Sequence, residues 1–157
     1  DIAIITGSPN HYTSNGRLNG YKKAMTNAGL TITDDYIQCG DYCIDGGYEA
    51  MMRLCKLQKR PTAIFISNYD MTIGAYLAIN YLRLKIPDDI SVIGFDNFPL
   101  ANVVNPPLSF AEQPTNVMGT EAGKLLYRRI CGDYSDYPKT IMHKPTMHYK
   151  ESIRQLT

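Results

Sequence analysis

Three short apolar runs, separated by segments with helical spacing, constrain the fold of this chain more than any other feature. The runs are Ile2–Thr6, Thr62–Ile66 and Ile90–Phe95. Strands that are apolar at every position, rather than at alternate positions, are typical of parallel sheets buried on both faces. Their alternation with helices predicts an α/β fold, in which helices cover both faces of a parallel sheet.

The segments between the apolar runs predict helices. From Leu18 to Ala28 apolar residues recur with helical spacing, and Gly29 then predicts the helix end. Gly46 to Gln58 and Met71 to Leu84 show the same periodicity. Asp35 to Cys39 predicts a weaker strand between the first two helices.

The pattern changes after Asp96. Leu108 to Glu112 predicts a short strand, and Pro114 to Ile130 predicts a helix with one apolar face. A polar loop, Gly132 to Pro138, precedes a weakly alternating segment, Thr140 to Lys150, that predicts one or two final strands. Because the last helix does not follow the strand–helix rhythm, we expect it to belong to a second subdomain that is mostly absent from this chain.

Charge and hydropathy exclude some functional classes. The net charge is +1 in 157 residues, which is not the basic surplus of a nucleic-acid-binding domain. Any DNA-binding surface is therefore expected outside this chain. No apolar run approaches the roughly 20 residues that cross a bilayer, and the first residues lack the basic flank of a secretory signal. Because the chain starts inside an apolar strand, we expect further sequence upstream.

Four cysteines are present, at positions 39, 43, 55 and 131. A disulfide framework is not expected in a chain of this length with this much apolar sequence. Cys39 and Cys43 have a spacing that metal sites use, but no histidine or second cysteine pair completes a set of four ligands. We therefore expect reduced thiols packed as small apolar groups, a cytoplasmic protein and no metal.

Polar and aromatic side chains follow the carboxyl ends of the predicted strands, which is where open α/β sheets bind ligands. Carboxylates and amides pair with vicinal hydroxyl groups, a guanidinium offers a planar fork of donors, and a phenol ring stacks on the apolar face of a sugar or base. The set therefore suits a polyhydroxylated ligand. Its members are Arg17, Tyr42, Asn68, Asp70, Asp96 and Asn97.

Each of these residues also has a purely structural interpretation. Asn68 and Asp70 stand where they would cap the helix that begins near Met71. Asp96 would cap the turn after its strand, and Arg17 would be a solvated residue in the first turns of its helix. The sequence leaves these alternatives open.

Catalytic signatures are sparse. The three histidines are far apart, and the chain has no G-x-S-x-G nucleophile elbow, no phosphate-binding G-x-x-x-x-G-K-[ST] loop and no G-x-G-x-x-G fingerprint. We therefore expect neither an enzyme nor a bound cofactor.

The segment Ile86-Pro87-Asp88-Asp89-Ile90-Ser91-Val92-Ile93-Gly94-Phe95-Asp96-Asn97 closely resembles a signature of LacI/GalR transcription regulators, I-P-x-D-[IV]-S-V-[IV]-G-[FY]-D-[DN]. Further matches follow in the family's order over nearly the whole chain. They are Gly16-Arg17-Leu18-Asn19-Gly20-Tyr21, Gly40-Asp41-Tyr42 with Gly47-Tyr48, Ser67-Asn68 with Met71 and Gly74-Ala75, and Pro106-Pro107-Leu108 with Gln113-Pro114 and Met118-Gly119.

The resemblance implies a periplasmic-binding-protein-like fold of type I with two subdomains. Residues 1–107 would form most of the C-terminal subdomain, 108–138 the crossover and last helix of the N-terminal subdomain, and 139–157 the returning final strands. By motif matching, the effector contacts fall on Thr13, Arg17, Tyr42, Asn68 and Asp96. Two departures leave the effector open: the usual Asn-Asp pair reads Asn68-Tyr69, and His11 replaces another polar contact.

The resemblance also implies a mechanism and partners. Family members carry an N-terminal helix-turn-helix domain, and an effector, commonly a sugar, binds between the subdomains and changes the affinity of a homodimer for operator DNA. The dimer face would include the helix around Ile73 to Tyr76 and the loop around Leu100 to Val104. No membrane partner is implied.

Two other functions share the predicted fold. A periplasmic sugar-binding protein of an uptake system has the same ligand chemistry, although four cysteines and the lack of an export signal count against it. A flavodoxin-like enzyme domain needs a phosphate or cofactor loop after the first strand, and Gly7-Ser8-Pro9-Asn10 is a poor candidate.

Overall fold

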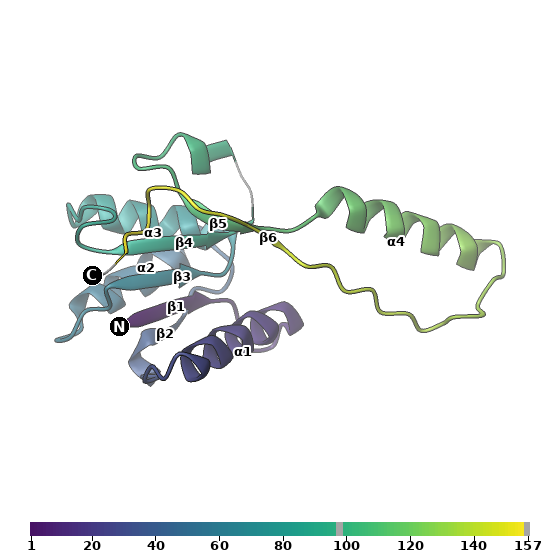
Figure 1. The fold of residues 1–157 in the computed structure, drawn as a ribbon, viewed down its shortest axis with the longest axis horizontal. Coiled ribbons are helices and arrows are strands. Elements are labelled where there is room, and N and C mark those ends of the chain that lie inside the picture. Colours follow the sequence, from purple (N-terminus) through teal and green to yellow (C-terminus); the bar gives the residue numbers. More distant parts are fainter. Residues whose placement is uncertain (97–98, 156–157) are drawn as a thin grey trace.

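The computed structural model describes residues 1–96 and 99–155, with the backbone alone at Leu100. Ten helices and strands and two short 3₁₀ turns follow one another along the described chain (Figure 1). In order they are β1 (Ile2–Thr6), α1 (Tyr12–Asn27), η1 (Asp34–Tyr36), β2 (Ile37–Cys39), α2 (Ile44–Lys56), β3 (Ala63–Ile66), α3 (Tyr69–Tyr81), β4 (Ser91–Phe95), η2 (Pro99–Asn102), β5 (Ser109–Glu112), α4 (Thr115–Ile130) and β6 (Thr146–His148).

The strands form one sheet in the order β2-β1-β3-β4-β5-β6. The first five strands are parallel, and β6 returns antiparallel to β5. The α/β fold with a parallel sheet is therefore confirmed. β1 is followed along the chain by β2 on one side, whereas β3 lies on the other, so the connections reverse direction between β1 and β3.

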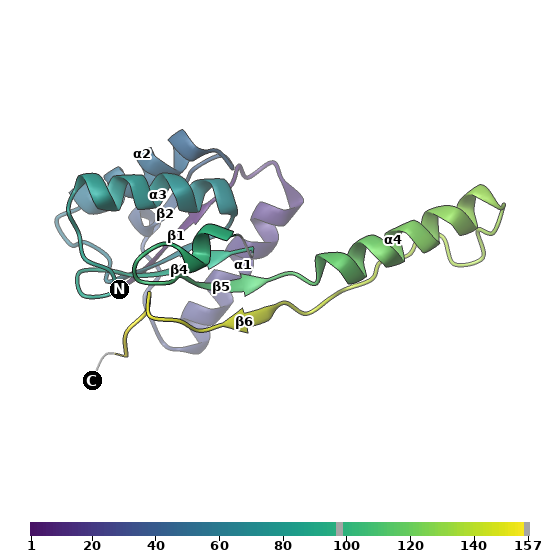
Figure 2. The ribbon, with the colours of Figure 1, turned by 90° about the horizontal axis from the view of Figure 1, so that it is seen from above.

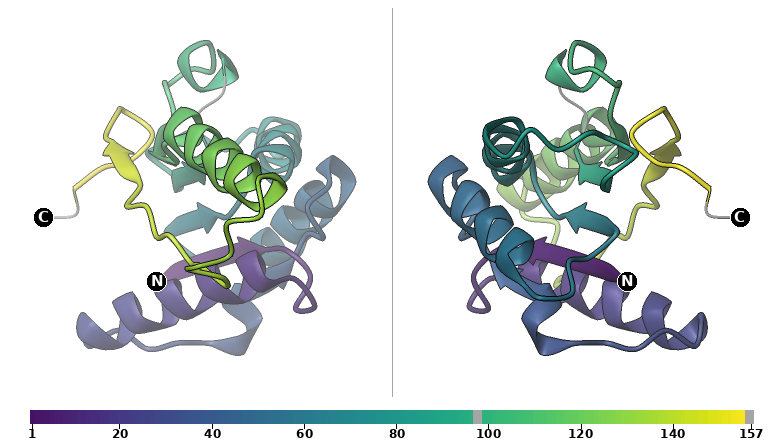
Figure 3. Two further views of the ribbon diagram at one scale, coloured as in Figure 1. Left: turned by 90° about the vertical axis from the view of Figure 1, so that its right-hand side faces the viewer. Right: turned by 90° about the vertical axis from the view of Figure 1, so that its left-hand side faces the viewer.

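Helices cover both faces of this sheet (Figures 2 and 3). On one face, Tyr21 and Met25 of α1 pack with Ile4 into a small core. On the other face, α2 and α3 bury a larger core that includes Met51, Leu54 and other aliphatic residues. Because strand residues point alternately to the two faces, apolar side chains are needed at consecutive positions, as the sequence shows.

Two boundaries differ from those that the sequence predicts. Asp35 and Tyr36 belong to η1 rather than to β2, because Tyr36 turns into the core and its hydroxyl donates to Lys59 O at 2.9 Å. α3 ends at Tyr81 rather than at Leu84, because Arg83 adopts a φ of 55° and the amide of Leu84 donates back to Ile79 O. Such a left-handed residue is a common way to end a helix.

The sheet continues beyond residue 107, since β5 pairs with β4. The chain leaves the body after β5, forms α4, and returns as β6 (Figures 1 and 2). No residue of α4 is buried, and apolar side chains such as Leu126 and Ile130 are exposed on it. An amphipathic helix with a bare apolar face needs a partner to cover it.

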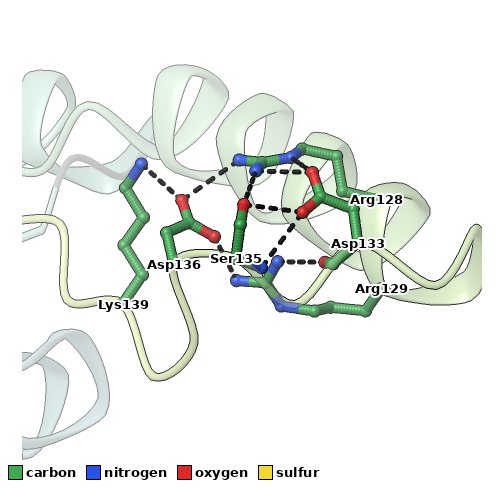
Figure 4. Close-up of polar contacts among 6 residues, drawn as sticks. All are labelled: Arg128, Arg129, Asp133, Ser135, Asp136 and Lys139. Atoms are coloured by element: carbon green, nitrogen blue, oxygen red, sulfur yellow. Dashed lines mark hydrogen bonds and ion pairs between the residues drawn. The ribbon is translucent and has the colours of Figure 1, made fainter.

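A cluster of ionic contacts holds the loop that follows α4 against the end of that helix (Figure 4). Arg128 contacts Asp133 at 2.6 Å and Asp136 at 3.1 Å, and Arg129 contacts Asp136 at 2.6 Å. Hydrogen bonds from Ser135, together with Arg128, lower the pKa of Asp133 to about 2. The pKa of Asp136 is also lowered, mainly by Arg129. Any stability from these carboxylates is present above their ordinary pKa and is lost as the pH falls toward 2.

None of the helices in the described residues is long and apolar enough to cross a membrane. The four cysteine thiols are unpaired, and Cys43 caps α2 by accepting a hydrogen bond from the amide of Gly46 at 3.3 Å.

Gly74 should be irreplaceable because α2 and α3 touch there through their backbones. A Cβ at Gly74 would lie 1.9 Å from Ile44 O and 2.6 Å from Tyr48 N. We expect Gly74→Ala to lower the free energy of unfolding by about 1–3 kcal/mol or more, the range of overpacked cores, as measured by urea denaturation. Gly20→Ala is the matched control: this α1 position is exposed with nothing within 4 Å, so alanine should stabilise by about 0.5–1 kcal/mol. Equal effects of the two substitutions would contradict the packing.

Candidate functional site

The loops after the five parallel strands all lie at one edge of the sheet, because parallel strands share a direction. The connections reverse between β1 and β3, and α1 and α2 leave toward opposite faces; ends of parallel strands at such a reversal are where open α/β sheets bind ligands. Ser8 to His11 follows β1, Gly40 to Cys43 follows β2, Ser67 and Asn68 follow β3, and Asp96 follows β4.

Arg17 of α1 reaches over the strand ends to the residues at the ends of β3 and β4. Its Nη1 donates to Ser67 O at 2.5 Å, and its Cζ lies 3.9 Å from the centre of the Phe95 ring. The side chain is half-buried, so it is not the solvated residue that the structural interpretation supposes. Among the described residues, none accepts a hydrogen bond from the other N–H groups of Arg17, which leaves part of the guanidinium fork for a ligand.

Tyr42 is held over the end of β1 by an unusual backbone. Asp41 and Tyr42 have φ values of 50° and 58°, in the left-handed region that side chains rarely occupy. The ring lies so close to Gly7 that a Cβ there would be 2.1 Å from Cε2 of Tyr42. The Thr13 hydroxyl lies 3.1 Å from that of Tyr42, and the His11 ring meets the tyrosine edge-on at 5.5 Å. These contacts hold the Tyr42 ring in one orientation at the edge of the sheet.

Asn68 caps α3, as its structural interpretation predicts. Its Oδ1 accepts a hydrogen bond from the amide of Met71 at 2.9 Å. Its amide NH₂ has no acceptor among the described residues, so the same side chain retains two donors at the edge. Asp70 lies in the first turn of α3, where a carboxylate favours the helix N-terminus.

Asp96 is bonded once to β5 and once to the residue that follows this strand. Its backbone has a φ of 78°, its amide donates to Ala111 O at 2.9 Å, and its Oδ1 accepts from Gln113 Nε2 at 2.6 Å. Within the part of the chain that the structure describes, nothing donates to Oδ2. The side chain thus has one oxygen in use and one open to a hydroxyl donor.

The structure brings all five predicted site residues, Thr13, Arg17, Tyr42, Asn68 and Asp96, to one edge of the sheet; Asn97 lies outside the described residues. Sequence reasoning missed two supporting side chains, Phe95 beneath Arg17 and Gln113 beside Asp96. Gln113 belongs to the Gln113-Pro114 motif match and stands directly after the strand at Leu108 to Glu112, but neither signal assigned it a contact with Asp96.

A hollow of about 270 Å³ adjoins the predicted residues and has mainly apolar walls. It lies between the body, α4 and the returning segment before β6, and joins the polar edge at Phe95 and Gln113. Its lining comprises Tyr12, Phe95, Gln113, Pro114, Met118, Ile141, Met142, His143 and Pro145. Polar groups beside an apolar surface are the usual composition of a small-molecule site.

The capping role of Asn68 has a measurable consequence for stability. We expect Asn68→Ala to lower the free energy of unfolding by about 1 kcal/mol, because the Met71 amide loses its acceptor. Asn68→Asp should stay within about 0.5 kcal/mol of wild type, because a carboxylate caps as well. Urea denaturation followed by circular dichroism compares the three proteins. A wild-type midpoint for Asn68→Ala would mean that the capping bond contributes no stability.

Comparison with known proteins places this geometry in a family. Residues 1–153 match the model of the periplasmic binding protein-like domain. The chain is 39% identical over 156 residues to the HTH-type transcriptional repressor PurR of Histophilus somni, covering 99% of this chain and 46% of the relative. It is 41% identical over 129 residues to the ribose operon repressor of Escherichia coli, covering 82% of this chain and 39% of the relative.

A solved structure agrees. The sugar-binding transcriptional regulator of the LacI family from Escherichia coli, complexed with phosphate, superposes with a TM-score of 0.83 at 32% identity, over 97% of this chain and 54% of that one. The chain therefore spans about half the length of the proteins it matches. The resemblance carried by the sequence motifs is confirmed, and the chain belongs to the periplasmic binding protein-like domain family, in the form found in LacI/GalR regulators.

Proposed function

We propose that this chain is the effector-sensing part of a LacI-type DNA-binding transcription regulator, and that its effector is a sugar or a related polyhydroxylated metabolite. The observation that carries the proposal is the convergence of a guanidinium, an amide, a carboxylate and a phenol on one edge of the sheet. Two relatives support it by name, the ribose operon repressor and the sugar-binding regulator.

Each side chain at the edge offers chemistry that a sugar would use. Asp96 Oδ2 accepts from a hydroxyl, while the remaining N–H groups of Arg17 and the NH₂ of Asn68 donate to hydroxyl or ring oxygens. The Tyr42 ring stacks against the apolar face of the ligand, and the Thr13 hydroxyl orients that ring through its contact at 3.1 Å. The pairing of one carboxylate with one guanidinium favours a neutral ligand over a strongly charged one.

The effector would be enclosed by a second subdomain supplied mainly by the upstream half of the protein. In this proposal residues 1–107, extended by β5, form one subdomain, α4 and its flanks to residue 138 belong to the other, and 139–157 return to the first. The bare apolar face of α4 and the greater length of the relatives support this division. Effector binding would favour the closed arrangement and change the affinity for operator DNA through a population shift.

A periplasmic sugar-binding protein of an uptake system is less well supported. Both curated relatives are repressors, and one carries the helix-turn-helix designation in its name. A regulator acts in the cytoplasm, where its operator lies. The same relatives favour a binding protein over an enzyme. An upstream helix-turn-helix, rather than an export signal, distinguishes the two binding functions.

Effector binding should depend on Asp96 and Arg17. In a thermal-shift screen of the full-length protein against pentoses, hexoses, disaccharides, sugar phosphates and purine bases, at least one sugar should raise the melting temperature. A ligand at 100 times its Kd contributes about 2.7 kcal/mol. Asp96→Ala and Arg17→Ala should each remove the shift, because each deletes a charged hydrogen-bonding partner.

Asp88→Ala is the matched control for this screen. Asp88 is exposed in the loop before β4, at the opposite edge of the sheet, so its loss should leave the shift unchanged. A shift that survives both Asp96→Ala and Arg17→Ala would place the effector elsewhere, and a shift from purines alone would replace the sugar.

We also propose a homodimer through the outer surface of α3 and the neighbouring loop. Ile73 and Tyr76 are half-buried, and burial raises the pKa of the Tyr76 hydroxyl. The exposed apolar side chains on this side are instead Leu77, Tyr81 and Val103, which are 51%, 71% and 76% exposed. Leu77 and Tyr81 are one helical turn apart on α3, and exposed apolar side chains that lie so close together are typical of an interaction surface.

Leu77→Asp should convert the full-length protein from dimer to monomer at micromolar concentration. A two-fold interface contains the substitution twice, so two carboxylates would lose hydration next to each other. Leu30→Asp makes the same change after α1, on the opposite face of the sheet, and should leave the dimer intact. Sedimentation velocity measures both, and a dimer that tolerates Leu77→Asp would rule out this face.

A further inference from the structure

We propose that Gln113 is the positioning residue that holds the Asp96 carboxylate ready for the effector. The inference rests on the proposed function and assigns a role to a residue that does not itself need to touch the ligand. Gln113 Nε2 donates to Asp96 Oδ1 at 2.6 Å. Among the described residues it is the only hydrogen-bond donor to that carboxylate.

The geometry of Asp96 explains why a support is needed. Its φ of 78° points the side chain away from the direction that an ordinary strand residue would take. The amide bond to Ala111 O at 2.9 Å fixes the backbone, but the side-chain torsions stay free to rotate. A hydrogen bond to Oδ1 selects one rotamer and leaves Oδ2 without a donor among the described residues. Fixing the rotamer before binding removes an ordering cost from the binding step.

Gln113 also has a particular place in the chain. It lies between β5 and α4, in the segment where the chain leaves the body, and it lines the hollow beside α4. The effector-binding carboxylate is therefore held by the crossover rather than by its own subdomain alone. The side chain is half-buried, which strengthens a hydrogen bond to a charged partner.

The immediate surroundings contain other titratable groups. Glu112 Oε2 lies 2.7 Å from His148 Nε2 on β6, and His143 lines the same hollow as Gln113. His11 lies across the edge, beside Tyr42. These groups are identical in wild type and in variants of Gln113, so any comparison must be made as a ratio to wild type at each pH.

Gln113→Glu is the decisive variant because it replaces the amide donor by a carboxylate at the same reach. Two carboxylates at this distance cannot both ionise and therefore share a proton. The folded state then binds more protons than the unfolded state, so stability relative to wild type should rise as the pH falls. Without any ligand, the deficit in melting temperature should be large at pH 8 and shrink toward pH 5. Gln58→Glu, at an exposed position after α2, should show no such trend.

Effector binding provides the second readout. Isothermal titration with whichever sugar of the screen binds wild type should give a Kd about tenfold higher for Gln113→Leu, because the carboxylate loses its charged hydrogen bond. For Gln113→Glu the ratio of its Kd to that of wild type should be large at pH 8 and fall toward 1 near pH 5, as the shared proton restores the bond. A merely structural role would not produce this recovery. Gln58→Leu is the control and should bind as wild type does.

The outcomes separate this inference from the proposed function. Wild-type affinity in Gln113→Leu, or a Kd ratio for Gln113→Glu that does not change with pH, would overturn the positioning role while leaving the effector site in place. If no sugar binds wild type, the proposed effector fails and the positioning role fails with it, even if the ligand-free pH trend shows that Gln113 and Asp96 are in contact.

Discussion

The parallel pairing of the strands determines where a binding site can lie in this fold. Each strand of β2-β1-β3-β4-β5 runs in the same direction, so every loop after one of these strands begins at the same edge. The chain must then cross back to the other edge, along α1, α2 and α3 in the first three crossovers and through the segment that contains η2 between β4 and β5. The reversal between β1 and β3 sends α1 to one face and α2 to the other. Arg17 is placed by this reversal: it starts from α1 on one face and reaches the carbonyl of Ser67 at the end of β3. No local sequence preference would bring those two residues together.

Each of three polar side chains at this edge has one group that is hydrogen-bonded to the protein and another group that has no protein partner among the described residues. Asn68 uses its oxygen to cap α3 and keeps its NH₂. One carboxylate oxygen of Asp96 accepts a hydrogen bond from Gln113, and one guanidinium nitrogen of Arg17 donates to the carbonyl of Ser67. The structural and functional interpretations of these residues are therefore not exclusive. A group that is partly satisfied by the protein is held in one orientation, and its remaining donors or acceptors point in a fixed direction. Orientation fixed before binding is what discriminates one arrangement of hydroxyl groups from another.

The main elements could be predicted from the sequence because burial on both faces requires continuous apolar runs. Ile2–Thr6 is β1 with the predicted bounds, and Gly29 has the positive φ of a helix terminator. Boundaries set by single residues could not be predicted, since nothing in an arginine side chain signals the positive φ of Arg83, and the inward turn of Tyr36 depends on its tertiary contact with Lys59. The motif matches predicted which residues gather at the edge. They gave no indication that Phe95 lies under Arg17 or that Gln113 supports Asp96, because those contacts join residues that are far apart in the chain and adjacent only in the folded protein.

If Asp96 contacts the effector as proposed, its hydrogen bonds would couple that contact to the position of α4. A carboxylate held only by its own loop could bind a ligand without any effect on the position of the crossover. Here the amide of Asp96 is bonded to Ala111 of β5, and its carboxylate to Gln113, immediately before α4 begins. Any rotation of the crossover must therefore either carry this carboxylate along or break a short, charge-assisted bond. In the proposed mechanism, a ligand that holds Asp96 would favour the crossover geometries that keep this bond, and such a difference in free energy between arrangements is what a population shift requires.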